Sequence, residues 1–166
     1  TPAQPNDKLK YLPEISRACE QVATEVQGIL QSGELPIVLG GDHSIAIGSI
    51  SGIAAHCRER EQTLGLIWFD AHADMNVPET TPSGNIHGMP LSALLGYGAP
   101  ALTHIAGFAP KLDPRFCAHV GARDIDRGER ELIRKLGMRF FTMREIDERG
   151  MSACMDEAIA IASQAS

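Results

Sequence analysis

Hydrophobic residues along this chain follow two patterns, which are short continuous runs and longer stretches where apolar residues recur every three or four positions. The second pattern is typical of amphipathic helices, and short continuous runs are typical of strands buried in a parallel sheet. We therefore predict helices at about 13–31, 45–60, 91–95, 129–136 and 152–162. We predict strands at about 35–39, 64–70, 116–121 and 138–142.

This alternation predicts an α/β fold, in which right-handed crossovers build a parallel sheet with helices against it. Residues 1–10 are polar with two prolines and are predicted to form a connecting loop. The stretch from residue 71 to Gly88 is rich in Pro, Thr, Ser, Gly and Asn and is predicted to be irregular. A loop of that length inside a compact domain is usually functional or disordered. No repeat or linker divides residues 1–166, which we expect to form one domain.

Polar clusters follow three of the predicted strands. They are Asp42-His43, Asp70 to Asn76, and Arg123 to Asp126. In open parallel sheets, ligands bind beyond the carboxyl ends of the strands. Asp70, His72 and Asp74 occupy every second position, so in an extended backbone their side chains point the same way. These clusters are therefore expected to meet in one site.

The donor atoms of these clusters favour a divalent metal ion. Carboxylates and imidazoles without a nearby thiolate suit Mn²⁺ or a related ion, and argue against a Cys-rich zinc site. A carboxylate such as Asp70 could bridge two ions, which would lower the pKa of a shared water. Taken alone, His43 has an ordinary explanation as a capping or core histidine, and Asp70 as the cap of a turn. A second histidine and three aspartates at adjacent strand ends favour the metal site.

Other polar residues near these clusters have both a functional and a structural explanation. His87 could act as a general acid or base, or could be a loop histidine bonded to backbone. One loop carries amide and hydroxyl donors that could bind a carboxylate or merely shape turns, namely Asn76, Thr81, Ser83 and Asn85. Acidic residues that could receive an ammonium group, or favour the dipole of the next helix, are Asp124, Asp126 and Glu129.

Some aromatic and histidine side chains receive no functional role. Trp68 and Phe69 are predicted to belong to the hydrophobic core, and no ligand-like neighbours accompany His56, His104 or His119.

The composition and charge of the chain limit the kinds of molecule that it is expected to bind. A formal net charge of −6 gives no electrostatic reason to expect nucleic acid or an anionic membrane as a partner. No apolar run approaches the roughly 18–20 residues of a membrane span. The 4 cysteines are scattered, as in a reduced, intracellular protein, and we expect a cytoplasmic location.

Three motifs together resemble the ureohydrolases, in the version found in the arginase family and most similar to its bacterial members. They are Gly40-Gly41-Asp42-His43-Ser44, Asp70-Ala71-His72-Ala73-Asp74-Met75-Asn76 and Ser83-Gly84-Asn85-Ile86-His87-Gly88-Met89-Pro90. The first two are common to the superfamily, and the third points to arginase rather than agmatinase. Residues 121–126 and Glu129 also match, so the resemblance covers nearly the whole chain.

The resemblance implies a three-layer α/β/α sandwich, usually assembled as homotrimers or homohexamers. It implies two Mn²⁺ ions, one held by His43, Asp70 and Asp74, the other by Asp70 and His72, with Asp70 bridging. A metal-bridging hydroxide would attack the guanidinium carbon of L-arginine and release L-ornithine and urea. Asp74 would take a proton toward the leaving amine, and His87 would shuttle protons.

The resemblance also implies how the substrate is held. Asn76 and Ser83, with Thr81 nearby, would bind its α-carboxylate. Asp126 would bind the α-amino group, supported by Asp124 and Glu129.

Two departures from the family pattern matter. Val77 stands where arginases commonly carry Thr, a minor change. The family's Ser-Phe-Asp-x-Asp-x-x-Asp-Pro strand, which supplies two further aspartate ligands, and an opening strand are absent from these residues. Four ligating side chains are too few for two coordination spheres of about six.

We therefore expect residues 1–166 to form a truncated version of the family fold, which by itself binds Mn²⁺ weakly. Two alternatives stay open: another ureohydrolase, such as an agmatinase or guanidinobutyrase, and a non-catalytic module that keeps the fold.

Overall fold

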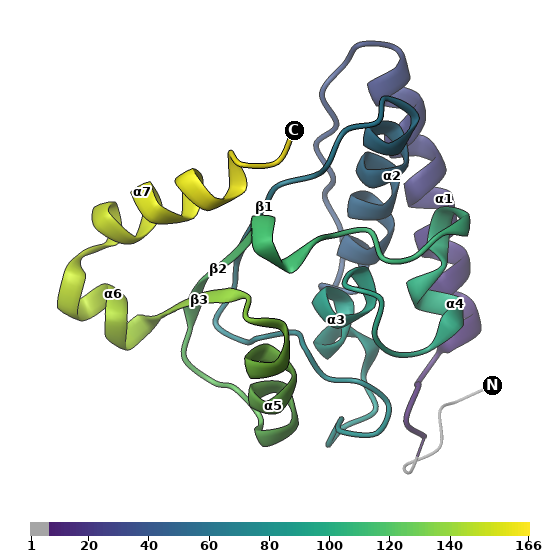
Figure 1. Ribbon diagram of the computed structural model, residues 1–166. Coiled ribbons are helices and arrows are strands. Elements are labelled where there is room, and N and C mark those ends of the chain that lie inside the picture. The colour runs from purple at the N-terminus through teal and green to yellow at the C-terminus, as the bar shows by residue number, and fades with distance from the viewer. Residues whose placement is uncertain (1–6) are drawn as a thin grey trace.

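A three-stranded parallel sheet lies at the centre of the described part of the chain (Figure 1). The computed structural model describes residues 7–166, so residues 1–6 of the predicted N-terminal loop lie outside the described residues. The strands are β1 (Leu66–Phe69), β2 (Cys117–Ala122) and β3 (Arg139–Thr142), in the order β1-β2-β3. Three of the four predicted strands are thus confirmed.

Helices pack on both faces of this sheet, as the α/β prediction requires. The α-helices are α1 (Leu12–Gln31), α2 (Ile45–Glu59), α3 (Pro90–Leu94), α4 (Pro100–Thr103), α5 (Arg127–Leu136), α6 (Met143–Arg149) and α7 (Met151–Ala162). Short 3₁₀ turns are η1 (Ile86–Gly88), η2 (Ile105–Gly107) and η3 (Pro114–Phe116). The five predicted helices are confirmed, whereas α4 and α6 are too short to give a clear periodic signal.

The two faces of the sheet bury different side chains, because successive residues of a strand point to opposite sides. On one face, Trp68 and Cys117 pack with residues of α2 and α3, and with partly buried residues of α5. On the other, Val120 and Phe141 pack against α6 and α7. The three layers implied by the resemblance are therefore present.

A tight helix pair extends the layer on the first face. Beta carbons added at Gly48 and Gly52 of α2 would lie 2.6 Å and 2.4 Å from the carbonyl oxygens of Cys19 and Ala23 in α1. The absent side chains thus allow the two helices to approach closely, as expected for glycines four residues apart.

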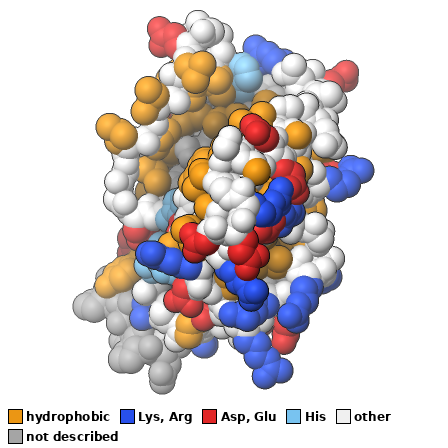
Figure 2. All heavy atoms as spheres, turned by 90° about the vertical axis from the view of Figure 1, so that its left-hand side faces the viewer, with side chains coloured by type: hydrophobic (Ala, Val, Ile, Leu, Met, Phe, Trp, Pro, Cys, Tyr) orange, Lys and Arg blue, Asp and Glu red, His pale blue; other side chains and the backbone are white. Residues whose placement is uncertain are grey.

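The predicted strand at 35–39 is wrong. This segment connects α1 to α2 without strand structure, and Leu35, Ile37 and Leu39 are 85–89% exposed. A strand exists only through pairing with a neighbour, and no described residue offers that pairing. Figure 2 shows hydrophobic side chains around a hollow on one face of the molecule.

The prediction that Trp68 and Phe69 are both core residues is half right. Trp68 is 4% exposed, whereas Phe69 is 59% exposed. Within the described residues, β1 is an edge strand paired only with β2, and Phe69 is its last residue. Among residues 7–166, no helix is both long and apolar enough to cross a membrane.

Candidate metal centre

The three polar clusters meet in one cavity at the carboxyl ends of the strands. Its volume is about 310 Å³. The predicted site residues all line it, and they are His43, Asp70, His72, Asp74, Asn76, Thr81, Ser83, His87, Asp124, Asp126 and Glu129. Chain order alone scatters these residues over three loops, so the parallel sheet is what brings them together.

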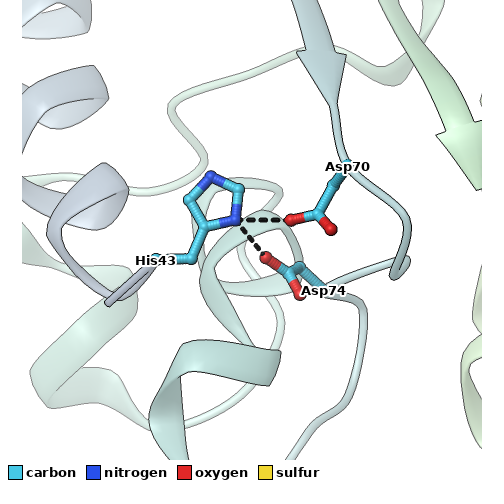
Figure 3. A group of neighbouring side chains, drawn as sticks. All are labelled: His43, Asp70 and Asp74. Atoms are coloured by element: carbon cyan, nitrogen blue, oxygen red, sulfur yellow. Dashed lines mark ion pairs between the residues drawn. The ribbon is translucent and has the colours of Figure 1, made fainter. Parts of the chain in front are cut away.

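Three of the four predicted metal ligands form a compact group. His43 Nδ1 lies 2.7 Å from Asp70 Oδ2 and 2.7 Å from Asp74 Oδ2 (Figure 3). One ligand atom from each residue lies within 4.8 Å of the others. These distances are short enough for the three side chains to share one ion.

This group has the features of a cation site. Asp74 Oδ2 is buried and has no aligned hydrogen-bond donor among the described residues. Its 2.7 Å contact with His43 Nδ1 is an ion pair if the His43 ring is protonated. Such an approach is favourable only when a proton or a metal ion stands between the atoms. The residues present therefore fit a divalent ion.

His43 is positioned by the turn that begins α2 and by an aromatic neighbour. The side chain of Asp42 accepts the Ser44 N–H at 3.0 Å and fixes the turn. The His43 ring stacks on the Trp68 ring with centroids 4.4 Å apart. Trp68 thus supports a predicted ligand from within the core.

The aspartates are held by backbone contacts. Asp70 Oδ1 accepts the His72 N–H at 2.8 Å, which folds the chain back immediately after β1. Asp74 has a φ of 53°, a left-handed conformation uncommon outside glycine, asparagine and aspartate. Its carbonyl accepts the N–H groups of Leu91 and Ser92, which ties the loop to α3.

Charge and burial shift the pKa values of this group. Contact with the Asp74 carboxylate raises the pKa of His43, although burial opposes the shift. Burial raises the pKa of Asp74, partly offset by contact with His43. Burial acts to raise the pKa of Asp70, but the His72 N–H and the charges of His43 and His72 bring it below its ordinary value. The cluster thus favours an added positive charge.

His72 lies beside this group but does not point into it. Its Nδ1 is 3.4 Å from Asp70 Oδ1, and its side chain is 68% exposed. The residue belongs to the compact loop between the two aspartate ligands, where it forms a parallel bridge with Asp124. Its role as ligand to a second ion stays a prediction.

The opposite wall is a connected network of polar groups. Asn76 Nδ2 donates to Asp126 Oδ2 at 2.9 Å, and Asn76 Oδ1 accepts from Thr80 Oγ1 at 2.9 Å. Glu129 is 4% exposed and accepts the N–H of Met75 at 2.9 Å and the N–H of Asp126 at 2.8 Å. Burial raises the pKa of Glu129. Glu129 thus supports the wall, and also contributes to the start of α5.

The remaining predicted residues lie at the cavity rim or under it. Thr81 is buried and its hydroxyl accepts the Gly84 N–H, so it braces the loop. Ser83 is exposed and its Oγ accepts the Asn85 N–H, which leaves its own O–H proton free for a ligand. His87 and Asp124 are also exposed on the cavity wall.

No functional role was predicted for His119, but the structure places it in contact with the loop that carries the aspartates. His119 Nε2 lies 2.7 Å from the carbonyl oxygen of His72. The side chain is fully buried, and burial lowers its pKa to about 4. No sequence signal could have found this contact, because the two residues are far apart along the chain and meet only through strand packing.

Comparison with known proteins agrees with this geometry. The sequence profile described as "Arginase family" matches residues 5–166. The chain belongs to the arginase family. It is 54% identical over 155 residues to an arginase of Brevibacillus brevis, an alignment that covers 93% of this chain and 51% of that protein.

Solved structures of the family share the fold. The arginase of Bacillus cereus superposes with a TM-score of 0.91 at 46% identity, covering 97% of this chain and 54% of that one. The arginase of Entamoeba histolytica, solved in complex with L-ornithine, gives a TM-score of 0.85 at 33% identity and covers 96% and 53% of the two chains. This chain thus spans about half the length of the relatives it matches.

Proposed function

We propose that this chain is the metal-binding part of a Mn²⁺-dependent arginase, which hydrolyses the guanidinium group of L-arginine to L-ornithine and urea. The observation that carries this proposal is the convergence of His43, Asp70 and Asp74 in a cavity whose opposite wall holds amide, hydroxyl and carboxylate groups. The names of the most similar relatives support arginase over agmatinase.

His43, Asp70 and Asp74 would hold one Mn²⁺, and Asp70 with His72 would hold the other. Oxygen and imidazole donors suit this ion. When bound, paired divalent ions lower the pKa of a water molecule and supply a nucleophile at neutral pH.

The protein residues would then handle protons. Asp74 is buried, which raises its pKa, as suits a carboxylate that accepts and returns a proton. The lowered pKa of Asp70 keeps that carboxylate ionised and able to bind cations. His87 is exposed on the wall of the cavity, where it can exchange protons between the site and water.

The opposite wall would orient the amino-acid end of the substrate. Asn76 is held in one orientation by Asp126 and Thr80, and the free hydroxyl proton of Ser83 can be donated to a carboxylate. The carboxylates of Asp126 and Asp124 are accessible to an ammonium group. Preorganised polar groups of this kind reduce the entropy lost on binding.

A complete enzyme requires further ligands. His43, Asp70, His72 and Asp74 cannot fill two coordination spheres of about six. We propose that polypeptide outside these residues supplies the remaining aspartates and covers the exposed segment 35–39. The cytoplasmic location and the trimeric or hexameric assembly stay predictions.

Expression of the longest open reading frame that contains this sequence tests the proposal. We expect about two Mn²⁺ per chain after gel filtration, and release of urea from L-arginine well above that from agmatine. The D156N variant, which alters an exposed aspartate of α7, should behave as wild type. Preferred turnover of agmatine would identify another ureohydrolase, and absence of both bound metal and turnover would favour the non-catalytic module.

A further inference from the structure

His119 occupies a position where an imidazole is costly. It lies in the central strand β2, is 0% exposed, and stacks on Phe140 of β3 with ring centroids 4.4 Å apart and planes inclined by 10°. Its Nδ1 is buried with no hydrogen-bond partner among the residues described. An unsatisfied buried polar atom costs about 1–3 kcal/mol, which an apolar ring would avoid.

The other ring nitrogen of His119 contacts the metal-binding loop, residues 70–74, and this contact offsets the cost of the unpaired Nδ1. The carbonyl oxygen of His72 can only accept a hydrogen bond, so the 2.7 Å contact requires that His119 Nε2 carries the proton. His72 lies midway between Asp70 and Asp74, the two aspartates that approach His43. The hydrogen bond of His119 thus acts on the backbone that presents the ligands.

The loop is anchored at its neighbouring carbonyls as well. The Ala71 carbonyl accepts the N–H groups of Arg123 and Asp124, and the Asp74 carbonyl accepts those of Leu91 and Ser92. These are backbone contacts, whereas the His72 carbonyl is held by a side chain from the middle of the sheet.

The strand register links His119 to the other wall of the site. Trp68 of β1, His119 of β2 and Phe140 of β3 are successive partners across the sheet, and so face the same side. The His43 ring stacks on Trp68. His119 therefore lies between the loop that carries the aspartates and the aromatic support of the histidine ligand.

We propose that His119 is a positioning residue for the metal centre. Its Nε2–H holds the His72 carbonyl, which fixes the peptide orientation between Asp70 and Asp74, and so the direction of both carboxylates. This inference rests on the proposed metal site, and extends it to a buried side chain that touches neither ion nor substrate. Groups that orient metal ligands in this way typically change metal affinity by about 10–100-fold when removed.

Three variants of the full-length polypeptide separate positioning from packing. H119F keeps an aromatic ring that can stack on Phe140 but removes the donor. H119Q keeps an N–H donor without the ring. F140L, the matched control, removes the stacking partner and leaves the hydrogen bond intact. For each, Mn²⁺ affinity is measured by calorimetric titration, and stability of the metal-free protein by urea unfolding.

We expect H119F to keep its stability while its Kd for Mn²⁺ rises by about tenfold or more. H119Q should recover part of the lost affinity, and F140L should lose stability while its Kd stays near that of wild type. In long-range ¹H–¹⁵N NMR spectra of the wild-type protein, the His119 ring should be the neutral Nε2–H tautomer.

Equal Mn²⁺ affinity of wild type and folded H119F would overturn the inference, as would an Nδ1–H tautomer. Similar losses of affinity in H119F and F140L would also overturn it, because both would then act through packing. If H119F does not fold, the NMR tautomer and the affinity of H119Q decide in the same way. Failure of the wild-type protein to bind Mn²⁺ would instead refute the proposed function.

Discussion

The two walls of the metal centre differ sharply in how this chain supports them. On one side, the loop that carries Asp74 and Asn76 is packed: these residues are 4% and 6% exposed, and Met75 between them donates its N–H to Glu129. The other side carries His43, which follows the exposed segment 35–39, where Leu39 is 89% exposed. A common cavity thus joins a wall that is packed and hydrogen-bonded to one that is more exposed, where the His43 side chain is 37% exposed.

This difference shows which parts of the site the described residues can hold rigid. Around Asp74, backbone N–H and carbonyl groups find partners in α3 and α5, so the loop has little freedom. On the other wall, His43 depends on the Asp42 turn and on stacking against Trp68. Ligands on the packed wall are therefore expected to control metal affinity most strongly.

The largest expected effect comes from removing the ligand on the packed wall. D74N in the full-length polypeptide should weaken Mn²⁺ binding by more than about 100-fold, beyond the range for groups that only orient ligands. The amide cannot carry the negative charge that the ion requires. Metal content after gel filtration and calorimetric titration measure the loss, with D156N as the control. A D74N protein that retains its Mn²⁺ would show that the compact group is no metal site.

In residues 1–166 expressed alone, truncation of a buried leucine should have a much larger effect on stability than truncation of an exposed one. L94A should lower the free energy of unfolding by about 2–5 kcal/mol, because Leu94 is 1% exposed and its loss leaves a cavity. L39A should change it by less than about 0.5 kcal/mol, because Leu39 is exposed. Urea unfolding measures both.

The same two variants, L94A and L39A, can also be compared in the full-length polypeptide. There, L39A should cost more than about 1 kcal/mol, because we expect further polypeptide to bury Leu39. An L39A effect near zero in both proteins would mean that the segment is solvated in the complete molecule too.

A smaller effect is expected at the carboxylate that supports the packed wall. E129A leaves the N–H groups of Met75 and Asp126 without their acceptor, and should lower the free energy of unfolding by about 2–3 kcal/mol. E129Q keeps one acceptor oxygen and should lie between E129A and wild type. The control is E131Q, at an exposed position of the same helix. Equal stabilities of E129A and E131Q would contradict the proposed support.

The smallest expected effect is on the pH dependence of stability, at an ion-pair network that lies outside both walls of the metal centre. Hydrogen bonds from Arg139, and then from Arg149, lower the pKa of Glu145 to about 2, although burial opposes the shift. Because the folded-state value is depressed, this stabilisation is present above the ordinary pKa near 4.5 and is lost as pH falls toward 2.

E145Q should therefore flatten the decline in stability between about pH 4.5 and 2, by no more than about 1 kcal/mol. Unfolding in urea at several pH values checks this, with E148Q as the control at an exposed position of α6. Identical pH profiles for wild type and E145Q would show that the ion-pair network contributes nothing.

The sequence by itself determined the class of fold and indicated which strand ends form the site. Periodicity predicted helices α1, α2, α3, α5 and α7, and short continuous apolar runs predicted strands β1 to β3. The carboxylate and imidazole donors at neighbouring strand ends predicted the group of His43, Asp70 and Asp74. These signals are local, so no tertiary information was needed to find them. The alternating spacing was wrong in one respect: the backbone is not extended as far as Asp74, and the His72 side chain does not point the same way as the two aspartates.

Only the tertiary structure decided which apolar runs become strands and which buried residues touch the site. Leu35 to Leu39 has the composition of a buried strand, but backbone pairing depends on a neighbour that the described chain does not provide. His119 looks like a core residue until strand register places its ring against the His72 carbonyl. Pairing and packing join residues distant along the chain, and local pattern contains no record of those partners.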